Sequence, residues 1–87
     1  MIQARVDIEP DSPPIRHFRP GEEIIYVLEG SLEYAIDGRE TKVYNAGEAL
    51  TVPAGVIHAV RNVGTGTAAE LATYIVEKGK PLLTVVQ

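Results

Sequence analysis

Turn signals that contain glycine or proline recur at short intervals along this chain. They are RPGE at 19–22, EGS at 29–31, DG at 37–38, NAG at 45–47, PAG at 53–55 and VGTG at 63–66. The segments between them are rich in Val, Ile, Tyr and Thr, residue types that favour a pleated, half-buried surface. Short strands separated by such turns predict an all-β sandwich or barrel with about seven strands.

Two segments test this interpretation. Residues 66–78 contain helix-forming residue types, but they run on into Thr73, Tyr74, Ile75 and Val76, so we predict a strand there. In residues 31–44, successive side chains alternate between two faces on either side of an Asp-Gly pair, which predicts a hairpin. The pair at 37–38 fits a two-residue primed turn, in which both central residues have positive φ.

The size of the chain and its lack of cysteine limit how the fold is stabilised. Its 87 residues predict one domain, residues 1–87, with a limited core. Because there is no cysteine, disulfides and thiolate zinc sites are excluded. Oligomerisation, or a metal held by histidine and carboxylate, would supplement the core.

Charge and hydropathy exclude two classes of partner. The net charge of −4 comes from 12 acidic and 8 basic residues without a basic stripe, so we expect no nucleic-acid partner. No apolar stretch approaches the ~20 residues of a membrane span, and the N-terminal residues do not resemble a signal peptide. We therefore expect a soluble, cytoplasmic protein that does not enter a membrane.

One of the two histidines, His58, lies in an ordered pattern at residues 47–62. Its spacing is Gly47, five residues, Pro53, one residue, Gly55, two residues, His58, three residues and Asn62. Gly47 opens a strand, and Pro53 with Gly55 forms the next turn. A histidine near the start of the following strand can point into the mouth of a barrel, where it can bind a metal or a substrate.

Residues 47–62 and an earlier region, about residues 15–30, together resemble the two motifs of the cupin superfamily. Residues 47–62 match the second cupin motif, and residues of about 15–30, with Glu23, six residues and Gly30, resemble the first. The resemblance implies a small single-domain cupin, whose fold is a jelly-roll or double-stranded β-helix barrel. It also implies a metal site made of two histidines and a glutamate from the first motif and one histidine from the second.

Carried over residue by residue, Glu23 and His58 take ligand positions of the family. In one alignment His17 takes the first histidine position of motif one and Arg19 the second. In the other, His17 is the second histidine and Ile15 stands at the first position. Both alignments leave His17, Glu23 and His58, enough for a degenerate divalent-metal site with open positions that suits Fe, Mn, Ni, Co or Zn.

Two functions from different classes follow. The metal site predicts a metal-dependent enzyme acting on a small oxygenated molecule. Alternatively, Arg19 pairs with Glu23, and the chain is a metal-free, non-catalytic module that binds a small acid or sugar through Arg19, His58 and a tyrosine, with Tyr26 and Tyr34 as the candidates. An inward Arg19 bonded to Glu23 favours the second function, and an outward one favours the first. A jelly-roll that serves only in assembly is the third alternative.

The ends of the chain predict a homodimer. Only about 15 residues precede the first motif, fewer than in most cupins, and uncovered strand edges invite pairing with another chain. We expect residues 2–8 or residues 80–87 to pair across a two-fold axis, with strand exchange as a variant.

Overall fold

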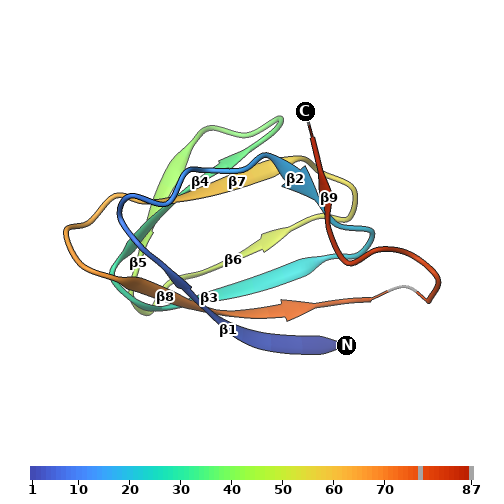
Figure 1. The fold of residues 1–87 in the computed structure, drawn as a ribbon, viewed down its shortest axis with the longest axis horizontal. Helices are drawn as coiled ribbons and strands as arrows, with labels where there is room; N and C mark the ends of the chain where they lie inside the picture. The colour runs from blue at the N-terminus through green and yellow to red at the C-terminus, as the bar shows by residue number, and fades with distance from the viewer. Residues whose placement is uncertain (77, 87) are drawn as a thin grey trace.

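The computed structural model describes residues 1–76 and 78–86, which form nine strands in two facing antiparallel sheets (Figure 1). The strands are β1 (Ile2–Ile8), β2 (His17–Phe18), β3 (Glu23–Glu29), β4 (Ser31–Ile36), β5 (Lys42–Asn45), β6 (Ala49–Val52), β7 (His58–Asn62), β8 (Ala68–Tyr74) and β9 (Thr84–Val85). The described residues contain no helix, which confirms the all-β prediction. They accordingly include no helix of the length and apolarity that crossing a lipid bilayer requires.

The order of the strands is that of a jelly-roll. One sheet has the order β1-β8-β3-β6 and the other β5-β4-β7-β2-β9. Strands from the first part of the chain therefore lie beside strands from the second: β1 pairs with β8, and β2 with β7. In the described residues these pairings leave two separate sheets, so the fold is a two-sheet sandwich whose interior lies between them.

Alternation along the strands builds the core. Ile25 and Val27 of β3, Leu32 of β4 and Val52 of β6 are the largest fully buried side chains, each at most 1% exposed. Burying an aliphatic side chain of this size contributes about 1.5–3 kcal/mol. The four come from both sheets, so the core joins the two layers.

Strand β8 confirms the prediction for residues 66–78 over most of its length. It pairs with β1 on one side and β3 on the other, so it is a central strand. Tyr74 lies opposite Glu23 in this register, which places an inward-facing tyrosine beside the first residue of β3. Glu77, at the end of the predicted strand, lies outside the described residues.

The hairpin of residues 31–44 forms, but the prediction of a primed turn with two positive φ angles is wrong. Gly38 has a φ of 84°, whereas no described residue other than glycine, Asp37 included, has a positive φ. The turn is closed by the Arg39 N–H donating to the Ile36 carbonyl at 3.0 Å, and β5 begins only at Lys42. Positive φ strains an L-residue, so only the glycine adopts it.

The two segments expected at a dimer interface are both edge strands. β1 ends one sheet and β9 the other, and each pairs with a single neighbour inside the chain. Of residues 80–87, only Thr84–Val85 form a strand, and Gln87 lies outside the described part. Pairing across a homodimer stays a prediction.

Candidate metal centre

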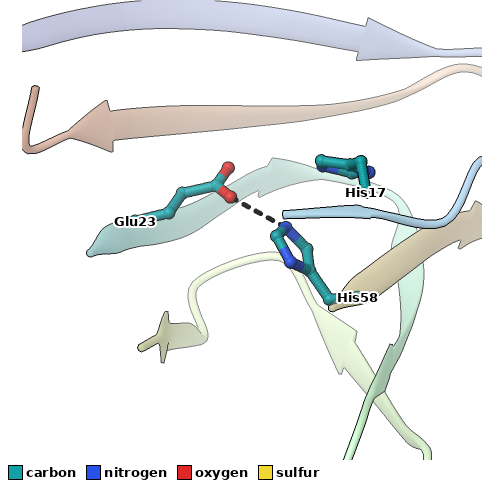
Figure 2. A group of neighbouring side chains, drawn as sticks. All are labelled: His17, Glu23 and His58. Atoms are coloured by element: carbon teal, nitrogen blue, oxygen red, sulfur yellow. Dashed lines mark hydrogen bonds and ion pairs between the residues drawn. The ribbon is translucent and has the colours of Figure 1, made fainter. Parts of the chain in front are cut away.

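Three strands bring the side chains of His17, Glu23 and His58 together in the interior (Figure 2). His17 lies directly opposite His58 in the β2–β7 pairing, and Glu23 begins β3 in the facing sheet. The three residues are 8%, 3% and 2% exposed. One potential ligand atom from each lies within 4.8 Å of the others.

Two glycines position these residues. A Cβ on Gly21 would lie 1.9 Å from the carbonyl oxygen of Ile75, so only glycine allows the turn before Glu23 to pass this close to the chain after β8. Gly55, with a φ of 74°, donates its N–H to the Arg19 carbonyl at 2.8 Å. The turn before His58 is thereby tied to the segment between His17 and Glu23.

Both imidazoles are held by the backbone in the same way. His17 Nδ1 lies 2.8 Å from the carbonyl oxygen of Ile15, and His58 Nδ1 lies 3.0 Å from that of Val56. A carbonyl oxygen only accepts hydrogen bonds, so Nδ1 carries the proton in each ring. The neutral form of each histidine therefore keeps its lone pair on Nε2, the tautomer that a metal ion requires.

The contact between His58 and Glu23 fits two ligands of one ion. His58 Nε2 lies 3.1 Å from Glu23 Oε1, and a lone-pair nitrogen facing a carboxylate oxygen needs a proton or a cation to bridge them. Adjacent ligands of an octahedral ion with bonds of ~2.1 Å lie about 3 Å apart. In a facial arrangement of two histidines and one carboxylate all three ligands are adjacent, so a pair at the 4.8 Å limit would need to close by about 1.8 Å.

The environment of His17 keeps this ring neutral. Burial lowers its pKa most, the electrostatic interactions with His58 and Arg19 lower it further, and the hydrogen bond to Ile15 and the charge of Glu23 oppose the change. A neutral ring at pH 7 is the form that binds a metal.

Arg19 points inward and contacts the same carboxylate oxygen as His58. Its Nε donates to Glu23 Oε1 at 3.2 Å, and its side chain is only 13% exposed. The guanidinium carbon lies 4.2 Å from the centre of the Tyr74 ring, and Nη1 donates to the Leu82 carbonyl at 3.4 Å. This is the orientation that we expected for a metal-free pocket, so a metal ion must compete with Arg19 for Glu23.

The two candidate tyrosines lie in different places. Tyr26 is 45% exposed, because alternation along β3 turns Glu23 and Ile25 inward and Tyr26 outward. A ligand-binding role for Tyr26 in the interior therefore does not agree with the structure. Tyr34 is 2% exposed, and its ring stacks on that of His58 with centroids 6.4 Å apart.

Glu70 is a buried acid that the sequence analysis did not single out. It is 3% exposed, and it accepts a hydrogen bond from the Tyr34 hydroxyl at 2.5 Å. Burial raises the pKa of Glu70 to about 7, the charge of Glu23 adds to the increase, and the bond from Tyr34 opposes it. Glu70 is two residues before Ala72 and four before Tyr74, so extending the alternation of β8 backwards would have placed it inside.

Comparisons with known proteins agree with this geometry. The chain matches the cupin domain over residues 4–76. Germin-like protein 1-1 from Oryza sativa subsp. japonica is 40% identical over 77 residues, which are 82% of this chain and 35% of that protein. A solved oxalate oxidase in complex with the substrate analogue glycolate is 30% identical with a TM-score of 0.79, covering 97% of this chain and 45% of that one. The chain thus spans only about a third of its germin-like relative.

A more distant structure supports the fold alone. A cupin-like protein from Thermotoga maritima has a TM-score of 0.82 at 18% identity, covering 97% of this chain and 62% of that one. The match over residues 4–76 includes most of β1 and all of β2 to β8, and it contains all three residues of the candidate centre. This chain belongs to the cupin domain family.

Proposed function

We propose that this chain binds a divalent metal ion through His17, Glu23 and His58 and, on that ion, a small carboxylic acid. The observation that carries the proposal is the convergence of three buried ligand atoms within 4.8 Å. Two imidazole nitrogens and one carboxylate form a donor set that suits Fe(II) and also accepts Mn, Co, Ni or Zn. Three protein ligands leave coordination positions open for an exogenous molecule.

The class of ligand is supported by Arg19 and by the relatives. A guanidinium matches the geometry of a carboxylate, and Arg19 lies within hydrogen-bonding distance of Glu23 at the edge of the site. The solved relatives of about 30% identity are oxalate oxidases, two of them in complex with glycolate. An ion that takes over Glu23 leaves the Arg19 guanidinium available to the carboxylate of the bound acid.

The residues of the site then have separate roles. The metal supplies Lewis-acid polarisation of the bound acid. The carbonyls of Ile15 and Val56 hold the two imidazoles in the ligating tautomer, and Glu23 offsets part of the charge of the ion. Burial excludes water from the site, which strengthens these electrostatic interactions. The proposal extends to a metal-dependent enzyme acting on a small oxygenated acid.

Titration of untagged, chelator-treated protein with Mn²⁺ or Co²⁺, followed by calorimetry, tests the metal site. We expect one ion per chain, and we expect Glu23→Gln to weaken binding by at least about 100-fold because it removes the charged ligand. Glu33→Gln is the matched control, since Glu33 pairs with Arg61 on the outer face, and it leaves binding unchanged. Wild-type protein that binds no ion, or Glu23→Gln protein that binds as wild type does, contradicts the proposal.

The second candidate function is a metal-free module that binds a small acid or sugar. The observation that favours it is the bond between Arg19 and Glu23, which already satisfies the carboxylate that a metal needs. In this case Arg19, His58 and Tyr34 hold the ligand, and binding requires no metal ion.

Substitution of Arg19 separates the two functions. If a metal binds, Arg19→Gln raises its affinity about tenfold because a competing cation is removed, and Arg19→His raises it further by adding the imidazole found in the family motif. If the module is metal-free, wild-type protein binds glycolate in excess chelator and Arg19→Gln abolishes that binding. Calorimetry with Mn²⁺ and with glycolate distinguishes these results.

A further inference from the structure

A groove of about 270 Å³ opens between the edge strand β1 and the strands β7, β2 and β9. Six aliphatic side chains line it: Val6, Ile8, Ile15, Val60, Leu83 and Val85. His17 also lines this groove, so one residue belongs both to the groove and to the candidate metal centre. The groove therefore approaches the site from the side of β2.

The rim of the groove is mostly apolar, and the one carboxylate that lines it, Asp7, pairs with Arg5. Ile15, Leu83 and Val85 are 55%, 41% and 52% exposed. Val6, Ile8 and Val60 below them are partly buried, and Ile8 and Val60 pack against the core. A hydrocarbon group that covers the rim removes this surface from water, which is favourable at about 25 cal/mol per Å².

The backbone links the groove directly to the site. His17 pairs with His58 on one side of β2 and with Val85 of the rim on the other. Its Nδ1 is held by the carbonyl of Ile15, so a rim residue also orients the imidazole. His17 is thus the residue at which the groove and the candidate metal centre meet.

We propose that the groove holds the hydrocarbon part of the acid bound at the metal, so that the preferred ligand is a monocarboxylic acid with an aliphatic body. This inference rests on the proposed function. A volume of 270 Å³ has room for roughly nine water-sized groups. It is too small for a folded partner, and it lies below the ~300 Å³ of the smallest drug-sized pockets. Glycolate, which has no hydrocarbon body, would leave it empty.

A series of straight-chain acids tests the proposal on the metal-loaded protein. We expect affinity to rise about threefold for each added methylene from acetate to about octanoate, and then to level off when the groove is full. Val85→Ser at the rim reduces the gain per methylene, whereas Val43→Ser, an equally simple change at a 39% exposed valine on β5, leaves it unchanged.

The outcomes separate this inference from the metal proposal. An affinity that does not change with chain length in protein that binds one ion overturns the groove and leaves the metal site intact. A chain-length dependence that is equally strong in metal-free protein shows that the groove binds the acid without the ion, and it overturns the inference that the metal holds the carboxylate; the titration with Mn²⁺ tests the metal site separately. Light scattering that shows two chains for wild type and one for Val85→Ser, with no chain-length dependence, assigns the groove to a second copy and overturns the proposal.

Discussion

The two ends of strand β7 carry buried polar residues of opposite character. Asn62, 4% exposed, has its hydrogen-bonding capacity used by the backbone alone. Its Nδ2 donates to the carbonyls of Ile8 and Gly66, each at 2.8 Å, and its Oδ1 accepts from the Gly64 N–H at 2.8 Å. These bonds close the turn after β7 and attach it to the end of β1.

His58 lies at the other end of β7 and is 2% exposed. Only one of its two ring nitrogens, Nδ1, forms a hydrogen bond with the backbone. Its second nitrogen faces Glu23, whose Oε1 is also contacted by Arg19. A buried group with every partner in the backbone stabilises the fold, whereas one that faces another acceptor keeps a position for a proton or an ion. The partners of a buried polar residue therefore indicate its role: Asn62 stabilises the fold, and His58 is available for chemistry.

The largest effect that tests this comparison is on stability. Asn62→Ala removes the three hydrogen bonds that close this turn, so we expect it to lower the free energy of unfolding by about 3 kcal/mol. Metal affinity of the folded fraction should be unchanged. Urea denaturation measures the change, and Asn45→Ala, at an exposed asparagine in β5, is the control with an effect below about 1 kcal/mol. An equal loss of unfolding free energy in both variants would show that the hydrogen bonds of Asn62 have no special structural role.

Substitution at the other end of β7 should act on binding. His58→Ala removes a ligand, so we expect metal affinity to fall by at least about 100-fold, measured by calorimetry with Mn²⁺. The loss of stability should be smaller than that of Asn62→Ala, because Arg19 still pairs with Glu23. If His58→Ala unfolds the protein more readily than Asn62→Ala does, His58 is the more structural of the two.

Glu70 is a third buried polar residue, and its role can be tested through the pH dependence of stability. Its folded pKa of about 7 lies above the ordinary value of 4.5, so the folded state binds more protons between these values and stability falls as pH rises through this window. From pH 5 to pH 8 this costs about 2 kcal/mol, and Glu70→Gln, whose amide oxygen still accepts from Tyr34, removes that part of the dependence. Denaturation of both proteins at several pH values measures it. Parallel stability curves would show that Glu70 titrates normally.

The smallest effect is expected at Tyr26. Because this side chain is outside the interior, Tyr26→Thr should change stability by less than about 1 kcal/mol and leave metal affinity unchanged. Tyr34→Phe is the matched change inside, where it removes the hydroxyl bonded to Glu70. A loss of metal or glycolate binding in Tyr26→Thr would show that this tyrosine contacts the ligand after all.

Spacing along the chain was enough to predict much of the fold, and the resemblance to the cupin motifs added much of the site. The turns around Gly47, Pro53 and Gly55 predicted a strand that begins near His58, and β7 begins at that residue. The resemblance to the cupin motifs implied that Glu23 and His17 lie near His58, and the structure brings these three side chains together. The turns and strands themselves are predictable because strand alternation and turn chemistry are local properties.

Other features depend on partners that are distant in the sequence. The inward orientation of Arg19 is set by Glu23 nearby and by Tyr74 and Leu82 beyond β7. A long, flexible side chain follows whichever partners the fold brings near it, so its direction is not encoded in its neighbours. The aliphatic groove beside His17 likewise combines β1, β7 and β9 and has no signature in any one segment.

Residue types and short-range spacing predicted the β class and the positions of the main turns, and the resemblance to the cupin motifs pointed to three residues able to hold a metal. The folded chain was needed to show that Arg19 contacts Glu23, that Glu70 is buried against Tyr34 and that His17 lines an apolar groove. Burial and charge pairing arise where segments from different parts of the chain meet, and only the folded arrangement sets those distances.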